Sequence, residues 1–430
     1  MYKGTSVAGG LALAALLSAA PFAAHATNGY FLMGYGAKSR AMGGASVGYA
    51  QDSTTAATNP AGLADVGTRG DIDAMVFSVD RAAACCVAPN GVVSGATLFL
   101  IPTMGGAMKF NRKLSFGFAA VGAGANTRYN QNFFIDDPLQ PGSQPDPNST
   151  LGVSLMQLIM APGGSYNLNR NHSVGASLLI GVQTFRAYGL EVFKRFSKEP
   201  DYVTNNGNDW SYGAGARIGW RGKFLDEKVT LGATYASKVY MSKFDKYKGL
   251  FAGDGSFDIP ENYAVGISVK ATDKLTIAFD VHRILYSDIP GVGNPSTPIS
   301  AAVDPTDPAK LGASTGPGFG WDDQTAYKLG IAYELNPKWT VRMGYNYGKS
   351  PIPNGPELEF ATLAPATVEK HIGLGATYNL SRNSEINLAF THAFKNTQQA
   401  ELSGTDLPFN TLTTVEMKHT AYEIGYAFKF

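Results

Sequence analysis

Large apolar residues alternate with small or polar ones in many short segments, from about Asp71 to the end of the chain. In the last segment the large apolar residues are Tyr422, Ile424, Tyr426, Phe428 and Phe430. The residues between them are Ala421, Glu423, Gly425, Ala427 and Lys429. Successive side chains of a β-strand point to opposite faces, so this period of two predicts strands with one apolar face.

The same alternation occurs at residues 275–281, 327–335 and 339–347, with aromatic residues gathered near the segment ends. A half-buried soluble sheet would show the same period. Aromatic residues at strand ends favour a membrane barrel instead, because such residues line both interfaces of a bilayer. Only alternate residues of a barrel strand meet lipid, which fits a chain with 16% charged residues and 50 glycines.

The connections between these segments alternate between short turns and long polar loops. The short turns are residues 111–113, 167–171, 222–226, 272–273, 336–337 and 381–383. The long loops are residues 82–92, 125–150, 190–209, 241–260, 286–321, 349–366 and 396–413. Thirteen connections join fourteen strands, an even number as expected of a single-chain bacterial barrel, with short turns toward the periplasm and long loops outside. We therefore predict an all-β fold, a fourteen-stranded antiparallel transmembrane β-barrel.

The first residues of the chain predict export. Lys3 precedes an apolar core at residues 7–20, and Ala24-His25-Ala26 is a small-x-small cleavage site. This pattern is typical of a secretory signal peptide over residues 1–26, with the mature chain beginning near Thr27.

Residues 27–69 are rich in glycine and alanine and lack the alternation. So long a segment is unusual in a compact domain unless it has a function, and a fourteen-stranded barrel has a wide lumen. We expect residues 27–69 to form a plug inside a barrel of residues 70–430.

Composition and motifs exclude several function classes. A formal net charge of +1 gives no electrostatic basis for binding nucleic acid. The six histidines lack metal-ligand spacing, and no nucleophile elbow, P-loop or metalloprotease motif is present, so no cofactor, metal or catalytic residue is expected. Cys85 and Cys86 are adjacent, which is too close for ordinary disulfide geometry. A vicinal disulfide or a metal site is the alternative to our expectation, two small residues in an exposed loop, and the oxidation state stays open.

Three groups of motifs occur in order along the chain. The first comprises Gly29-Tyr30-Phe31, the glycine-rich residues 40–48, Gln51-Asp52 and Asn59-Pro60-Ala61. The second is Pro260-Glu261-Asn262-Tyr263, and the third is residues 339–344 followed by Ser350-Pro351-Ile352-Pro353. With the strand pattern and a terminal Phe430, the chain resembles the long-chain fatty acid transporter family of the outer membrane, the FadL/TodX type.

The resemblance implies a plugged, monomeric barrel that is not an enzyme and carries fatty acids or aromatic hydrocarbons passively. A ligand would be captured among the outer loops, reach a pocket above the plug, and leave through a gap in the wall. The implied setting is the outer membrane with its lipid and lipopolysaccharide, reached through the barrel assembly machinery. The sequence does not separate fatty acids from hydrocarbons.

The resemblance also assigns roles to single residues near the ligand. Tyr30 and Phe31 would reach into the pocket, the alternative being a disordered terminus. Arg186 would bind a ligand carboxylate, as an arginine fork can. However, Arg186 shares its strand face with Val174 and Leu178, which should meet lipid. It needs a bulge to turn inward and is otherwise an interfacial charge.

Two further assignments concern the wall. The triplet Asn59, Pro60 and Ala61 would abut the gap, and Asn59 could bond to an unpaired strand there; an ordinary Asn-Pro turn is the alternative. Gly122 and Gly124 would mark an inward kink of the third strand, the alternative being small luminal residues.

Three other functions fit parts of the pattern. A general porin would have opposed charges in its lumen and an inward loop in place of a plug. An adhesin or surface receptor could be built on the long loops. A barrel enzyme would need a set of Ser, His and Asp groups, which the sequence does not provide.

Overall fold

The structure is a computed structural model that describes residues 28–86, 88–134, 150–401 and 412–430. The predicted signal peptide, residues 1–26, lies outside the described residues. Over the described ranges, no helix has both the length and the hydrophobicity to cross a membrane.

One sheet contains all the strands. They are β1 (Arg69–Cys85), β2 (Ala88–Val93), β3 (Leu98–Lys109), β4 (Leu114–Asn126), β5 (Gly152–Met160), β6 (Gly163–Asn167), β7 (His172–Tyr188), β8 (Asp209–Phe224), β9 (Val229–Ala236), β10 (Tyr240–Met241), β11 (Asn262–Lys270), β12 (Leu275–Ile284), β13 (Gln324–Asn336), β14 (Trp339–Gly348), β15 (Lys370–Asn379), β16 (Ser384–Glu401) and β17 (Leu412–Lys429). β5 and β6 share the neighbours β4 and β7, so they form one interrupted wall strand. β2 and β10 add short pairings at the rim.

The remaining strands pair antiparallel with their neighbours, and β1 pairs with β17 from Arg69↔Lys429 to Ala84↔Thr414. This last pairing closes the ring. The wall therefore has fourteen strands, which confirms the predicted closed antiparallel barrel. Closure gives the first and last strands a partner, which matters in lipid because an unpaired backbone group is costly there.

The two faces of the wall differ as the alternation predicts. On β17, Tyr422 and Ile424 are 60% and 57% exposed, whereas Glu423 between them is 5% exposed. Most large apolar residues of the same alternation on β13 and β14 are exposed too, whereas Ile331 and Val341 are half-buried. The exposed ones are Tyr327, Leu329, Tyr333, Leu335, Trp339, Met343, Tyr345 and Tyr347. These side chains form the surface that lipid contacts, because the alternate residues are buried in the lumen.

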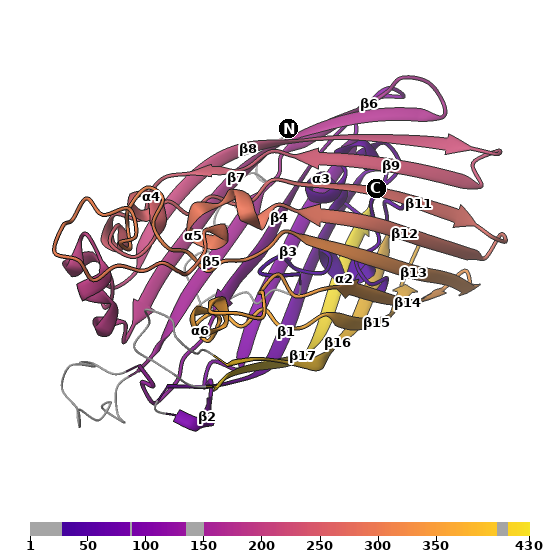
Figure 1. Ribbon diagram of the computed structural model, residues 1–430. Coiled ribbons are helices and arrows are strands. Elements are labelled where there is room, and N and C mark those ends of the chain that lie inside the picture. Colours follow the sequence, from indigo (N-terminus) through magenta and orange to yellow (C-terminus); the bar gives the residue numbers. More distant parts are fainter. Residues whose placement is uncertain (1–27, 87, 135–149, 402–411) are drawn as a thin grey trace, which may run out of the picture.

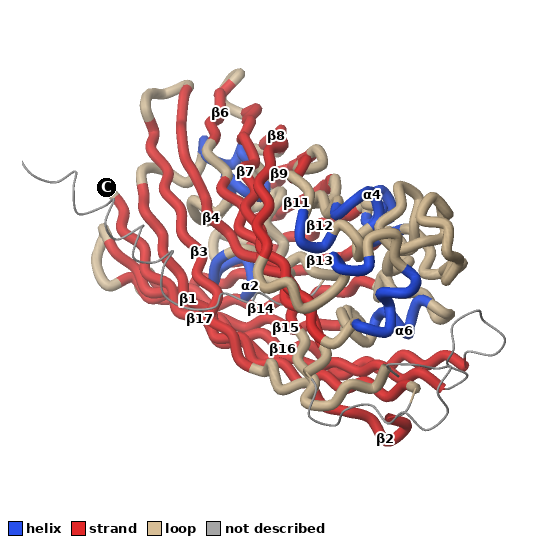
Figure 2. The backbone as a smooth tube through the Cα atoms, turned by 90° about the vertical axis from the view of Figure 1, so that its left-hand side faces the viewer, coloured by secondary structure: helices blue, strands red, loops and turns tan. Residues whose placement is uncertain are grey.

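The long connections gather at one end of the barrel and the short turns at the other (Figure 1, Figure 2). The long connections carry short helices: η2 (Glu191–Phe196), η3 (Pro200–Tyr202), η4 (Asp245–Tyr247), α4 (Ala252–Gly255), η5 (Tyr286–Asp288), α5 (Pro290–Gly293) and α6 (Glu357–Ala361). We call these the loop end and the turn end.

Residues 28–68, the N-terminal segment, lie inside the ring (Figure 2) and contain α2 (Gly36–Ala41), α3 (Thr55–Thr58) and η1 (Pro60–Ala64). α2 contacts β14 to β17, and η1 contacts β4 and β6 to β8, so the segment reaches widely separated parts of the wall. Glycines allow this close approach. A Cβ atom on Gly344 would lie 2.1 Å from the backbone nitrogen of Gly43.

Several boundaries differ from the prediction. Residues 82–92 are not a single loop, because β1 extends to Cys85 and β2 follows from Ala88. β16 likewise extends to Glu401, and β17 begins at Leu412. The turn between β8 and β9 lies at residues 225–228 rather than 222–226. Where the alternating residues are small, the apolar and polar positions differ too little for the sequence to locate the ends of a strand.

The expectation that the cysteines lie in an exposed loop is wrong, because Cys85 and Cys86 are 1% and 9% exposed. A disulfide joins them, which is the alternative named from the sequence. They lie at the end of β1 in the main apolar cluster, with Leu358 and Phe360 of α6. The sequence could not show this burial, because α6 is more than 270 residues away along the chain.

Candidate functional site

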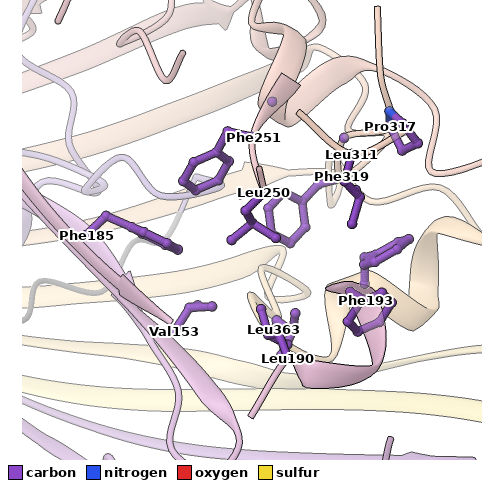
Figure 3. A pocket seen from close by; sticks show the side chains of 13 residues that line it. Val153, Phe185, Leu190, Phe193, Leu250, Phe251, Leu311, Pro317, Phe319 and Leu363 are labelled. Carbon is purple, nitrogen blue, oxygen red and sulfur yellow. The ribbon is translucent and has the colours of Figure 1, made fainter. Parts of the chain in front are cut away.

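An apolar pocket lies among the loop-end segments (Figure 3). Its cavity volume is about 40 Å³, and the empty space around it, including the part open to solvent, is about 480 Å³. Its 13 lining residues carry no charged or polar side chain: Val153, Phe185, Leu190, Phe193, Leu250, Phe251, Gly291, Leu311, Pro317, Gly318, Phe319, Phe360 and Leu363. A concave, apolar site of this kind binds hydrophobic ligands because it removes their surface from water.

The wall contributes two of these side chains, and outer segments contribute most of the others. Phe185 of β7 and Val153 of β5 point inward and are each 4% exposed. Phe193 lies in η2, Phe251 precedes α4, and Phe360 lies in α6. The pocket is therefore assembled from five connected regions that are distant in sequence.

Aromatic rings continue from the pocket toward the lumen. The ring centroid of Phe251 lies 4.6 Å from that of Phe185 and 4.9 Å from that of Phe257. Phe257 in turn lies 6.0 Å from Tyr30. These separations are typical of attractive aromatic pairs. The chain of rings links the pocket with the N-terminal segment.

Tyr30 and Phe31 are buried, 3% and 5% exposed. Tyr286 fixes this end of the segment, because its hydroxyl donates to the carbonyl oxygen of Asn28 at 2.6 Å and accepts from the Tyr30 nitrogen at 3.2 Å. Burial raises the pKa of Tyr286 well above its usual value, so the phenol stays neutral. Neither Tyr30 nor Phe31 lines the apolar pocket; Phe31 lines a second hollow below it.

This second hollow is narrow, with a cavity volume of about 10 Å³, and it lies between the N-terminal segment and the wall. Phe31 faces Val121 of β4, Ile159 of β5 and Leu179 of β7 there. Asn262, from the second motif of the sequence analysis, also lines it and accepts from Arg217 at 3.1 Å.

Beside this hollow, β3 and β4 separate. Their pairing ends at Thr103↔Val121. Beyond it, residues 98–102 continue the ladder with β1, and residues 122–126 continue the ladder with β5. We call these two stretches the β3–β4 window. Pro102 lies within it, and a proline is suited to an unpaired stretch because its nitrogen has no hydrogen to donate.

The window is bounded at the loop end by a bridge between Ser94 and Tyr129. Gly124 within it has a φ of 151°, a conformation that favours glycine. A Cβ atom on Gly122 would lie 3.3 Å from the Ile101 side chain, so Ile101 approaches β4 where the backbones no longer pair.

The structure does not bring Asn59, Pro60 and Ala61 to the window. The side-chain nitrogen of Asn59 donates to the Val47 carbonyl oxygen at 3.0 Å and to that of Trp220, in β8, at 3.2 Å. η1, which begins at Pro60, contacts β6, β7 and β8 most closely. The triplet therefore fastens the N-terminal segment to another part of the wall.

Arg186 also lies away from the pocket. β7 pairs with β5 without a register shift, from Gly152↔Tyr188 to Met160↔Ile180, so no bulge turns Arg186 inward. It remains on the outer face, with its guanidinium carbon 4.4 Å from the centre of the Tyr188 ring. The strand parity noted in the sequence holds, and the structure does not bring Arg186 to the lining of the pocket or of the second hollow.

The pocket residues were not predicted from the sequence. A usable signal was present: Phe193, Phe251, Phe319 and Phe360 lie in four separate segments predicted to be polar outer loops. A loop that is exposed to water has no physical reason to carry large apolar rings. Their convergence could not be inferred without the tertiary structure.

Comparisons with known proteins place the chain in a family. Residues 11–430 match the family model described as outer membrane protein transport protein (OMPP1/FadL/TodX). No curated protein sequence matches the chain significantly.

Solved structures share the fold. The Pseudomonas putida toluene transporter TodX is 18% identical, with a TM-score of 0.67 over 93% of this chain and 99% of its own. A Pseudomonas aeruginosa FadL homologue is 14% identical, with a TM-score of 0.69 over 94% and 100%. The Ralstonia pickettii toluene transporter TbuX is 18% identical, with a TM-score of 0.64 over 93% and 99%. With the family model matching nearly the whole chain, this protein belongs to the OMPP1/FadL/TodX family of outer-membrane transport proteins.

Proposed function

We propose that this protein takes up small, uncharged hydrophobic molecules, with monoaromatic hydrocarbons as the best-fitting class. The ligand enters the apolar pocket at the loop end, passes Tyr30 and Phe31, and leaves sideways into the membrane through the β3–β4 window. The observation that carries the proposal is the pocket lining, which has 13 residues and no polar side chain.

A lateral exit suits an apolar solute. Each methylene group transferred out of water is stabilised by about 0.8 kcal/mol. A route that returned the solute to water inside the barrel would lose this contribution, whereas a route from the pocket into lipid keeps it. The hollow lined by Phe31 and Val121 adjoins the last paired residue of β4, so it lies at the start of such a route.

The absence of cations from the pocket lining favours an uncharged ligand, and Arg217, which lines the second hollow, already donates to Thr58, Thr234 and Asn262. A carboxylate buried among apolar side chains needs a partner, because burying an isolated charge is very costly. Arg186 lines neither the pocket nor the second hollow. The toluene transporters TodX and TbuX, which share the fold, have uncharged aromatic substrates by their descriptions.

A binding experiment tests the pocket. Phe251→Ala is expected to weaken displacement of an apolar fluorescent dye by toluene, up to about tenfold, because aromatic pairs contribute about 0.5–1.5 kcal/mol. Phe118→Ala is the matched control, since Phe118 is 45% exposed on the outer face. Equal toluene affinity in Phe251→Ala and the unaltered protein would contradict this site.

Long-chain fatty acids are the second candidate, supported by one buried cation. Lys310 is 3% exposed, precedes the lining residue Leu311, and donates to the Arg195 carbonyl oxygen at 3.5 Å. If a fatty acid is the ligand, Lys310→Met weakens oleate binding at least about tenfold and leaves toluene unaffected. We expect instead that toluene binds more tightly than its carboxylate analogue benzoate.

A reversible cross-link tests the exit. In a Cys85→Ser/Cys86→Ser background, Ile101→Cys and Gly122→Cys place a disulfide across the β3–β4 window. Oxidation is expected to lower toluene uptake by cells at least about tenfold, and reduction is expected to restore it. Met108→Cys with Phe116→Cys, a directly opposed pair in the closed part of the same ladder, is the control. Unchanged uptake after complete cross-linking of the window would exclude this exit while leaving the pocket untouched.

A further inference from the structure

Three potential metal-binding side chains meet at the loop end, apart from the apolar pocket. Cys85 ends β1, Cys86 follows it, and Glu359 lies in α6. One ligand atom from each of these residues lies within 4.8 Å of the others. Cys85 and Glu359 are each 1% exposed, and Cys86 is 9% exposed. The cluster is therefore buried and drawn from two distant parts of the chain.

The Glu359 carboxylate gives an independent indication that this cluster binds a ligand. Neither of its carboxylate oxygens has a hydrogen-bond partner within the part of the chain that the structure describes. Buried carboxylates are normally paired, hydrogen-bonded or bound to a metal, because isolating them from water is costly. Its neighbours Leu358 and Phe360 belong to the apolar cluster and offer no compensation.

We propose that, once the Cys85–Cys86 disulfide is reduced, the two thiolates and the Glu359 carboxylate bind a Zn²⁺ ion. Thiolate sulfur and carboxylate oxygen are both established zinc ligands, and three protein ligands leave one position of a tetrahedral ion open. A thiol-selective site also excludes Mg²⁺ and Ca²⁺, which prefer oxygen ligands alone.

The disulfide and the metal site are alternative states of the same sulfur atoms. A trialkylphosphine reduces the disulfide and takes one oxygen atom from water, which yields the phosphine oxide and two thiols. Zn²⁺ then displaces the two thiol protons and binds the resulting thiolates. The oxidised protein should therefore not bind the ion at this place.

Binding of the ion would also stabilise part of the apolar pocket. Phe360, the next residue after Glu359, and Leu363 both line the apolar pocket. A shared ion would tie the end of β1 to the segment that carries these two side chains. The metal site itself does not depend on the identity of the transported molecule.

A titration of reduced protein with Cd²⁺ provides the test. The mature chain is refolded in detergent with a trialkylphosphine, which is then removed under anaerobic conditions. One equivalent of Cd²⁺ is expected to produce an ultraviolet thiolate-to-metal charge-transfer band, and Zn²⁺ is expected to compete with it. Oxidised protein and the Cys86→Ser variant should lack the band.

Glu359→Gln separates this site from an ordinary cysteine pair. It is expected to weaken Cd²⁺ binding at least about tenfold, since even residues that only support metal ligands commonly contribute 10–100-fold. Glu357→Gln, two residues earlier in α6, is the matched control and should bind normally. The altered mobility of a folded barrel in unheated gels verifies folding of every variant. Absence of the band, or equal affinity in Glu359→Gln and Glu357→Gln, would overturn the proposal.

Discussion

The interior of the barrel differs sharply between its two ends. At the loop end, phenylalanines from the wall and the outer segments surround a pocket without polar side chains. Toward the turn end, the N-terminal segment is held by charged side chains. Lys38 and Arg40 of α2 form ion pairs with Glu385 and Glu423 of the wall.

The charged contacts continue along the N-terminal segment. Asp280 of β12 accepts from the backbone nitrogens of Ser46 and Val47 at 2.6 and 2.9 Å. Glu385 also accepts from Arg69, at 2.8 Å. Hydrogen-bonded ion pairs have strict geometry, whereas aromatic packing tolerates several arrangements. We call these charged contacts, made by Lys38, Arg40, Arg69, Asp280, Glu385 and Glu423, the floor. The difference indicates that the floor has one fixed geometry at the turn end, whereas the apolar pocket at the loop end can adapt to its ligand.

Removing the Glu385 carboxylate, which binds both Lys38 and Arg69, should have the largest effect on the free energy of unfolding. Glu385→Ala leaves Lys38 buried with only the Gln51 carbonyl oxygen as a partner, at 3.3 Å. Breaking a buried pair from one side costs about 3–5 kcal/mol. We expect the free energy of unfolding to fall by this amount. Urea unfolding of the refolded barrel in micelles, monitored by tryptophan fluorescence, measures it.

A paired change controls for the lost side chain in that experiment. Lys38→Met combined with Glu385→Gln removes the stranded charge, while Arg69 keeps its ion pair with Asp71 at 2.7 Å. Most of the stability should return. An equal loss in the single and paired variants would show that the floor depends on packing rather than on charge.

A conservative change in the pocket should have a moderate effect. Phe193→Leu keeps an apolar side chain of similar volume, and such changes usually cost less than about 1.5 kcal/mol. Toluene affinity should therefore fall no more than about tenfold, with the barrel still folded. A complete loss of binding would indicate that the pocket is as rigid as the floor.

The smallest effect is expected for Arg186→Ala. Because Arg186 lies on the outer face over Tyr188, its removal should change toluene affinity less than about twofold, within the range of a surface substitution. Lys248, whose amine lies 4.1 Å from the Tyr202 ring in another outer segment, offers a matched control as Lys248→Ala. A tenfold loss for Arg186→Ala alone would place it in the binding route after all.

The strand pattern was predictable because it is local. Tyr422, Ile424 and Glu423 follow the period of two, and each lies on the face that this period assigns. Arg186 follows the same rule, since Phe185 and Ala187 on either side of it are buried. The separation of β3 and β4 at the window was harder to predict, although Pro102 within a strand was a usable sign.

The alternating residues and turn chemistry of this sequence by themselves determined a closed, fourteen-stranded barrel with a lipid-facing outside, because strand periodicity acts between near neighbours. Only the tertiary structure decided which loop phenylalanines converge on a pocket, where Asn59 meets the wall, and that Glu359 lies beside Cys85 and Cys86. These contacts join residues tens to hundreds of positions apart, and their geometry is set by how the whole ring closes.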